Sequence, residues 1–296
     1  MKEKVKAFFA SIGYLLITLL VQVIVSTVGG LSVGIYFAIT QMSQINNGAI
    51  NLDADLSNVI EFTLSLTNIF LLISSILTVL VLILIYKIKK RNYKEEILIN
   101  RTNKFNIIFA VILGAACWLF NSGALSLIDE AGLFSSQFQY MEDVLSPLNG
   151  GSMIISIITI GIVAPFAEEF LFRGIIYNTL KKKVSIRWTI IIQAIMFGVF
   201  HGNIIQGSYA TLLGIVFGYV TYKTKSLWPA IIMHMVNNLI ATMFMYVPSD
   251  NISGILVYVV FLIMGIIGVT ISLMLIKKKN ERDEEIIDFR NINNLN

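Results

Sequence analysis

Residues 62–86 read FTLSLTNIFLLISSILTVLVLILIY, a stretch that contains no Asp, Glu, Lys or Arg. A helix needs about 20 mostly apolar residues to cross the hydrocarbon core of a bilayer, so this stretch predicts a membrane-spanning helix. Six further stretches lack the same four residue types: 7–52, 105–128, 144–167, 188–222, 226–249 and 251–276. The sequence therefore predicts an all-α, polytopic membrane protein.

The composition excludes an ordinary soluble domain. Of the 296 residues, 56% are hydrophobic and 14% are charged, and the mean hydropathy is +0.78. A soluble core of this length does not need so much apolar sequence. The one cysteine, Cys117, excludes an intrachain disulfide, and we expect it to pack as a small core residue.

The uncharged stretches predict eight crossings. The stretch 188–222 is too long for one ordinary span and is interrupted by GNIIQGS at 202–208, so it is expected to form two short helices. Each of the other six supplies one helix, and the fourth continues past a charged cluster to Leu180. We expect three parts: spans one to three in residues 1–140, a core of spans four to eight in 141–276, and a charged cytoplasmic tail in 277–296.

The charged residues divide between the two sides of the membrane. With one crossing in 7–52, a single side holds 21 of the 22 Lys and Arg residues. The positive-inside rule identifies that side as the cytoplasm, and both termini lie on it. The loops of the other side carry acids and no Lys or Arg: Asp53, Asp55, Glu61, Asp129, Glu130, Glu142, Asp143 and Asp250.

The basic loops are interpreted as orientation signals that contact membrane lipids. Neither zinc-finger spacing nor a basic face interleaved with aromatic residues accompanies them, so no nucleic-acid partner is expected. The composition is rich in Ile, Asn and Lys, which is typical of bacteria. The expected location is therefore a bacterial plasma membrane.

Three charged residues lie inside the fourth span. The segment EEFLFR places Glu168, Glu169 and Arg173 within six residues, although one charge at the bilayer centre costs roughly 2.5–3.5 kcal/mol. Glu169 and Arg173 are four residues apart, so on a helix they share a face and can pair. Glu168 points about 100° away from Glu169 and has no counter-ion on its own helix.

Both histidines of the chain also lie within predicted spans. His234 is followed four residues later by Asn238, on the same helical face, whereas Asn237 is expected to face elsewhere. Counted from the cytoplasmic ends of their helices at 1.5 Å per residue, Glu168, His201 and Asn238 are roughly 20 Å deep, and His234 is roughly 13 Å deep. Each of these residues alone could serve only packing. Their common level favours one site.

These residues together suit the hydrolysis of an amide. Glu168, which has no counter-ion, can act as a general base, and an imidazole beside it can hold and polarise a water molecule. A second imidazole and a carboxamide can donate hydrogen bonds to a developing oxyanion. Two histidines and a glutamate are also a known way to hold a catalytic zinc ion, so Glu168, His201 and His234 form an alternative metal site. The mechanism in which Glu168 acts as the general base requires no cofactor.

Three short motifs carry a resemblance to a known family. EEFLFR (168–173) fits EExxxR, FGVFH (197–201) fits FxxxH, and HMVNN (234–238) fits HxxxN. In this order the motifs resemble those of the CAAX protease and bacteriocin-processing family of intramembrane proteases, also called the Abi family, over about residues 145–250. The resemblance implies an eight-helix CAAX-protease-like bundle that acts as an endopeptidase within the bilayer.

The resemblance also implies roles for particular residues. Glu168 and His201 would activate water, His234 and Asn238 would bind the oxyanion, and Glu169 and Arg173 match the supporting positions. Members are described as metalloendopeptidases and also as metal-free glutamate proteases, so the zinc question stays open. The implied substrate is a peptide or lipid-modified protein, and the implied bacterial roles are bacteriocin processing and self-immunity.

Two other functions fit part of the pattern. Intramembrane acids and histidines also build proton relays, so a proton-coupled transporter is one alternative. A transporter should show repeated halves, and no repeat is visible. The second alternative is a non-catalytic bacteriocin immunity protein that binds a peptide in the same fold.

Overall fold

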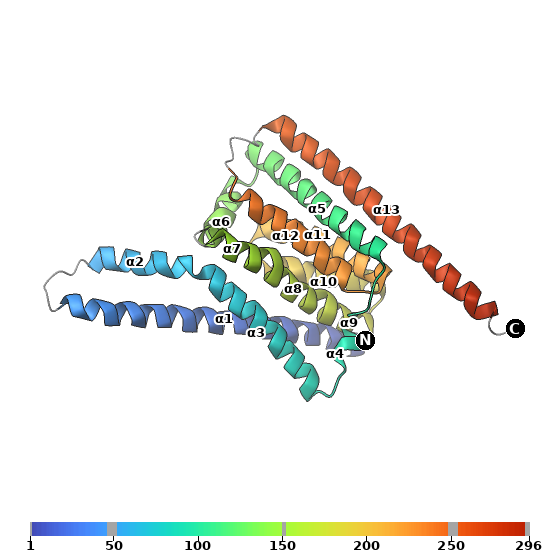
Figure 1. The fold of residues 1–296 in the computed structure, drawn as a ribbon, viewed down its shortest axis with the longest axis horizontal. Helices are drawn as coiled ribbons and strands as arrows, with labels where there is room; N and C mark the ends of the chain where they lie inside the picture. Colours follow the sequence, from blue (N-terminus) through green and yellow to red (C-terminus); the bar gives the residue numbers. More distant parts are fainter. Residues whose placement is uncertain (1, 46–51, 150–151, 248–253, 294–296) are drawn as a thin grey trace.

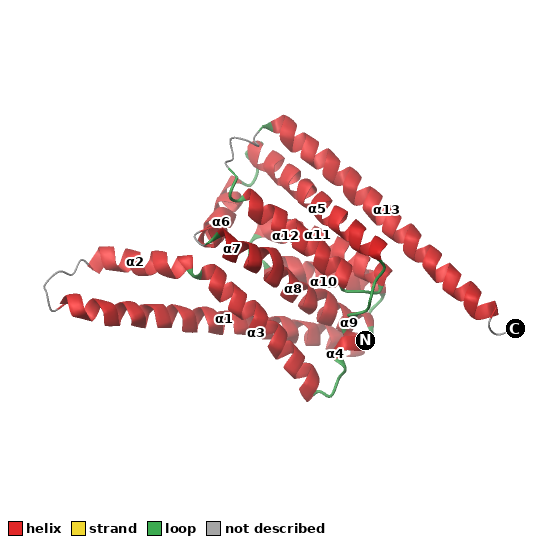
Figure 2. Ribbon diagram, in the orientation of Figure 1, coloured by secondary structure: helices red, strands yellow, loops and turns green. Residues whose placement is uncertain are grey.

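A computed structural model describes residues 2–45, 52–149, 152–247 and 254–293. These residues form helices joined by short loops, and the described ranges contain no strand (Figures 1 and 2). The all-α fold class is therefore confirmed.

Six of the described helices are long and apolar enough to span a membrane. They are α1 (Lys2–Ile45), α3 (Thr67–Ile88), α5 (Lys104–Glu130), the composite helix Met153–Lys181, α11 (Ile204–Thr224) and α13 (Ile255–Asn293). Two more apolar helices are shorter: α10 (Ile186–Phe200), with 15 residues, and α12 (Trp228–Phe244), with 17. A multi-pass membrane bundle is thus confirmed, and the number of eight crossings stays a prediction.

The helices form a bundle with the composite helix at its centre. Helices α1 and α3 pack together along one edge, and α5 packs against α13 along the opposite edge (Figure 1). Helix α12 lies between them and contacts both α5 and the composite helix. Short helices connect the spans: α2 (Leu52–Ser65), α4 (Tyr93–Glu96), α6 (Ser135–Leu145) and η1 (Ser146–Asn149).

Glycines allow α5 and α13 to approach closely. A Cβ atom on Gly123 would clash with the backbone of Leu262, and one on Gly265 would clash with the backbone of Phe120. Small residues at such seams are usual in membranes, where helices associate mainly through van der Waals packing. Cys117 lies on α5 and is 1% exposed, which confirms the prediction of a core residue.

Helices α10 and α11 form a hairpin whose turn is shorter than predicted. The sequence predicted an interruption over 202–208, but α11 already begins at Ile204. Asn203 explains the early start, because its side-chain oxygen accepts a hydrogen bond from the Gln206 backbone N–H at 2.7 Å and caps the helix. Gly202 makes the turn itself, at a φ of 75° that favours glycine.

The composite helix departs from α-helical geometry before the charged motif and again within it. It consists of α7 (Met153–Ser156), η2 (Ile157–Val163), α8 (Ala164–Glu169), η3 (Phe170–Ile176) and α9 (Tyr177–Lys181), and η2 and η3 are π-helical. Proline removes a hydrogen-bond donor, and Pro165 is the second residue of α8, next to the wider turns of η2 that can accommodate this loss. π-Helical turns are rare and frequently occur at functional sites.

Candidate active site

A buried chain of three side chains links the composite helix to α12. Nη1 of Arg173 donates to Oε1 of Glu169 at 2.7 Å, as the four-residue spacing predicted. The same oxygen lies 2.8 Å from Nδ1 of His234. Glu169 and Arg173 are fully buried, and His234 is 3% exposed. The sequence paired Glu169 with Arg173 alone, so the contact with His234 is a finding of the structure.

Glu169 sets the orientation of the His234 ring. An ionised carboxylate can only accept hydrogen bonds, so Nδ1 of His234 carries a proton and Nε2 is the nitrogen left for other partners. Nε2 lies 3.8 Å from Oε2 of Glu168. The side chain of Glu168 is 21% exposed, whereas that of its neighbour Glu169 has no exposed surface. The two adjacent acids thus contact opposite edges of one imidazole ring.

Aromatic rings enclose the buried cation. The guanidinium carbon of Arg173 lies 4.4 Å from the ring centroid of Phe197 and 5.1 Å from that of Phe217. The same two rings contact the imidazole of His234, with centroid separations of 5.6 Å and 5.2 Å. Cation–π contacts of this kind stabilise a desolvated charge. The paired carboxylate and the two rings together account for a charged residue at this depth.

The His201 ring is fixed by the backbone. His201 directly follows α10, and its Nδ1 lies 2.8 Å from the carbonyl oxygen of Phe197. A carbonyl oxygen only accepts, so Nδ1 carries the proton and Nε2 holds a lone pair. His201 therefore has the tautomer that a proton acceptor at Nε2 needs.

Two neighbouring asparagines of α12 form one hydrogen-bonded unit. Nδ2 of Asn238 donates to the carbonyl oxygen of Ile160 in η2 at 3.1 Å, and Oδ1 of Asn238 accepts from Nδ2 of Asn237 at 3.0 Å. One N–H of the Asn238 amide remains for another acceptor. The expectation that Asn237 faces elsewhere was wrong, because it lines the same cavity and positions the Asn238 amide.

One cavity of about 330 Å³ brings the predicted residues together. Among its lining residues are Glu168, His201, His234 and Asn238. Glu169 and Arg173 lie behind the cavity wall and contact it through His234. The rest of the lining is mostly apolar, but it also includes the polar side chains of Gln206 and Tyr209 from α11 and Asn121 and Ser122 from α5. No charged motif marked these four residues in the sequence.

The types of residue at the site suit zinc, but their positions do not. Two imidazoles and a carboxylate are suitable zinc ligands. Within the described ranges, however, no three His, Cys, Asp or Glu side chains come close enough together to hold a metal ion. His234 has one nitrogen engaged by Glu169 and the other beside Glu168, so its ring joins the two carboxylates. The described arrangement therefore does not form the three-ligand zinc site.

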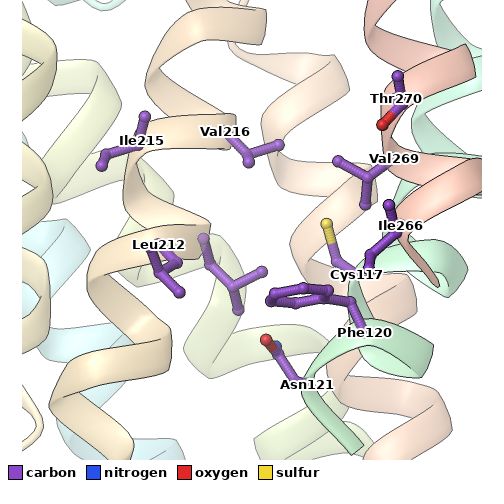
Figure 3. A pocket seen from close by; sticks show the side chains of 10 residues that line it. Cys117, Phe120, Asn121, Leu212, Ile215, Val216, Ile266, Val269 and Thr270 are labelled. Carbon is purple, nitrogen blue, oxygen red and sulfur yellow. The ribbon is translucent and has the colours of Figure 1, made fainter. Parts of the chain in front are cut away.

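A second cavity lies outside this polar cluster. It has a volume of about 320 Å³ and is enclosed by α5, α11 and α13 (Figure 3). Apart from Asn121 and Thr270 its lining is apolar, and it contains none of the seven residues that the three motifs fix. Asn121 and Leu213 belong to the walls of both cavities. The titratable groups expected to act in catalysis are thus confined to the first cavity.

Comparison with known proteins agrees with the three motifs. Residues 150–240 match the family described as type II CAAX prenyl endopeptidase Rce1-like, and this range contains all three motifs. A protein of Bacillus subtilis (strain 168) described as "Putative membrane peptidase YdiL" is 27% identical over 148 residues. That match covers 49% of this chain and 59% of the relative. No solved structure matches the chain significantly. The motifs, the helical membrane fold and these matches support an assignment of residues 150–240 to the CAAX protease and bacteriocin-processing family.

Proposed function

We propose that this protein is an intramembrane endopeptidase that hydrolyses a peptide bond with a water molecule activated by Glu168 and His201. The observation that carries the proposal is the arrangement of the two imidazoles. Each has Nδ1 engaged by a fixed acceptor, and both rings line one cavity together with Glu168. A carboxylate base (Glu168), an oriented imidazole that accepts a hydrogen bond (His201) and an amide donor (Asn238) in one cavity are the groups that amide hydrolysis needs.

The first step is attack by water. The carboxylate of Glu168 takes one proton from the water, and Nε2 of His201 accepts a hydrogen bond from the other O–H. The water oxygen forms a bond to the carbonyl carbon, and the carbonyl π electrons move onto its oxygen. The resulting oxyanion accepts the remaining N–H of Asn238.

His234 provides the second donor to the oxyanion when its Nε2 is protonated. The carboxylate of Glu169 accepts the Nδ1–H of the ring and so holds Nε2 toward the cavity. In the second step the C–N bond breaks, and Glu168 gives its proton to the leaving amine. The carboxylate is thereby regenerated, and each proton that leaves the water is accounted for.

The decisive experiment is cleavage of a peptide library by the detergent-purified protein and its Glu168→Gln variant. The variant should lower turnover by about 10²- to 10⁴-fold, because it removes the general base. Glu95→Gln is the matched control, since that carboxylate is exposed on α4, away from the cavity. Retained cleavage by Glu168→Gln would contradict the proposal.

The same assay separates the alternatives. A chelator arm with metal analysis addresses zinc: loss of cleavage on chelation and its return with zinc would assign a metal to Glu168, His201 and His234. Uptake of a solute into proteoliposomes without cleavage of any peptide would favour the transporter. Protection of cells against a bacteriocin by a variant that lacks both Glu168 and His201 would favour the non-catalytic immunity protein.

A further inference from the structure

The catalytic cavity occupies only one half of the bundle. Helix α5 runs from the basic loop at Lys104 to the acidic pair at its end, and it contributes to the cavity only from Trp118 onward. Helix α12 starts beside the basic loop at Trp228 and contributes only from His234 onward. In both helices the lining residues lie in the part farther from the basic loops.

In the other helices, too, the lining residues lie in the part farther from the basic loops. Helix α10 starts at the basic loop, and its lining residue Phe197 lies in its last turn. Helix α11 runs in the opposite direction, and its lining residues end at Leu213, well before its basic terminus. In the composite helix the last lining residue is Glu168. The catalytic residues therefore form the floor of a cavity that extends away from the basic loops.

Below that floor the composite helix is tightly packed. We call this half, which ends at the loops 87–104, 181–187 and 223–225, the basic end. Large side chains of the composite helix are fully buried there, namely Phe172, Arg173, Ile175, Ile176 and Leu180. Ile97, which follows α4, is also fully buried, and it lies so close to Gly174 that a Cβ atom there would clash with it.

Two loops seal the basic end by pairing with each other. The backbone N–H of Leu227 donates to the carbonyl oxygen of Leu98 at 2.9 Å. The hydroxyl of Ser226 donates to the carbonyl oxygen of Asn100 at 2.8 Å, and the Asn100 amide donates to the carbonyl oxygen of Lys225 at 3.1 Å. These three bonds hold the loop before α12 against the segment that follows α4.

The opposite half, which we call the acidic end, is bounded by α6, η1 and the last turns of α5 and α12. Met141 and Leu145 of α6 line the cavity, and both are partly exposed. Met245, just after α12, and Leu148 of η1 line the cavity beside them. We call these four residues the rim. The cavity thus meets the surface among apolar side chains of a short helix.

We infer that the substrate reaches the catalytic residues from the acidic end, the face opposite the basic loops. This inference rests on the proposed endopeptidase function. By the positive-inside rule the acidic end faces away from the cytoplasm, so the substrate is a polypeptide segment on the outer side of the membrane.

The rim indicates the character of that segment. Its inner residues are apolar, so apolar side chains suit the positions beside the scissile bond. Near the rim, α5 and α6 also carry four exposed acids: Asp129, Glu130, Glu142 and Asp143. The sequence has no Lys or Arg between residues 105 and 172 to offset them. An apolar segment with a Lys- or Arg-rich flank is therefore the substrate that complements this end.

Thiol labelling from one side of the membrane tests the entry side. Three Ser→Cys variants are nearly isosteric: Ser122 in the cavity wall, Ser136 exposed on α6, and Ser185 exposed in a basic loop. The buried Cys117 of the wild-type protein provides the background. A charged, membrane-impermeant methanethiosulfonate is added to sealed vesicles of either orientation.

The expected result is that Ser122→Cys reacts from the same side as Ser136→Cys, at least tenfold faster than from the side that labels Ser185→Cys. Reaction of Ser122→Cys from the Ser185→Cys side, or from neither side, would overturn the inference. A peptide with an apolar centre and a Lys-rich flank should slow the reaction of Ser122→Cys more than its Glu-flanked counterpart does. Equal protection by the two peptides would overturn the charge preference.

The two proposals can fail separately. If the purified wild-type protein cleaves no peptide, the endopeptidase proposal fails, while labelling still reports the open end of the cavity. If it cleaves peptides but Ser122→Cys reacts only from the basic side, the entry side is wrong and the endopeptidase stands. Modification of Ser122→Cys should also reduce cleavage at least tenfold, whereas modification of Ser185→Cys should leave it unchanged.

Discussion

The basic end and the acidic end are built from the same helices, yet the composite helix is tightly packed at one and lines the polar cavity at the other. At the basic end, Tyr86, Ile176 and Leu180 are completely buried among neighbouring spans. At the acidic end, the corresponding space is a cavity with a partly exposed rim. Glu168 and Glu169 lie at the boundary, one facing the cavity and the other the packed half. Glu169 thus contributes to the packed half of the bundle, whereas its neighbour Glu168 faces the cavity through which we infer that the substrate enters.

The largest effect should come from the buried carboxylate on the packed side. Glu169→Gln leaves the Arg173 charge without a counter-ion, which should lower the free energy of unfolding by about 3–5 kcal/mol. Denaturation in detergent measures this change, and Glu130→Gln should stay within about 0.5 kcal/mol of the wild type. Equal stability of Glu169→Gln and wild type would contradict the assigned role.

A double variant sharpens this result. Glu169→Gln combined with Arg173→Met removes both buried charges, so it should recover most of the lost stability. Cleavage should stay low, because Nδ1 of His234 no longer faces a carboxylate. Recovery of both stability and cleavage would show that Glu169 serves packing alone.

The second effect concerns the cavity side. Asn238→Ala removes the proposed oxyanion donor and should lower kcat by about 10²- to 10³-fold, with little change in stability. Asn237→Ala removes only the residue that holds the Asn238 amide, so it should reduce kcat by a smaller factor. Single-turnover kinetics with a cleaved peptide measures both values. A larger loss for Asn237→Ala than for Asn238→Ala would reverse the two roles.

The third effect tests the seal at the basic end. Gly174→Ala places a methyl group against Ile97, and such overpacking should cost about 1–3 kcal/mol. Ile97→Val in the same chain removes a methyl group from the contact and should restore part of the loss. The thermal unfolding midpoint in detergent compares the three proteins. An unchanged midpoint for Gly174→Ala would show that this contact yields without strain.

The smallest effect concerns pH at the basic end. A hydrogen bond from Arg91 lowers the pKa of Glu96 from its usual value of 4.5 to about 2, and Lys182 contributes in the same direction. A lowered pKa means that this carboxylate stabilises the fold above pH 4.5, and that its contribution disappears as the pH falls to about 2. The contribution of such a partly exposed pair is at most about 1 kcal/mol.

Glu96→Gln measures this contribution directly. The wild type should lose more stability than Glu96→Gln between pH 5 and pH 2, and the two proteins should respond alike above pH 5. Unfolding midpoints across this range give the comparison. Parallel curves throughout would show that the ion pair does not stabilise the folded state.

The sequence predicted those features that depend on local spacing. Runs without charge locate the long spans, because the bilayer fixes their length and polarity. The four-residue spacing of Glu169 and Arg173 predicted their ion pair, and the pair forms although Arg173 lies in the π-helical segment η3. The common depth of Glu168, His201, His234 and Asn238 predicted that they would meet, and all four line one cavity.

Features that depend on tertiary contacts could not be predicted. Glu169 and His234 are 65 residues apart, and no helical period relates them. Asn237 was placed from an ideal helix, whereas its orientation depends on the amide of Asn238 and on η2. The π-helical segments have no simple sequence signal apart from Pro165. The short turn after His201 depends on a cap at Asn203, which the predicted interruption over 202–208 overlooked.

The shortness of α10 has a consequence for the surrounding lipid. Fifteen residues extend about 22 Å, whereas the hydrocarbon core of a bilayer is about 30 Å thick. Val199 and Ile204, on either side of the turn, are 70% and 65% exposed, so acyl chains contact this flank. If α10 crosses the bilayer as predicted, we expect the leaflet beside it to thin to match the helix, which would bring headgroups and water toward His201. Lipids with longer acyl chains should therefore disfavour hydration of the site without contacting any catalytic residue.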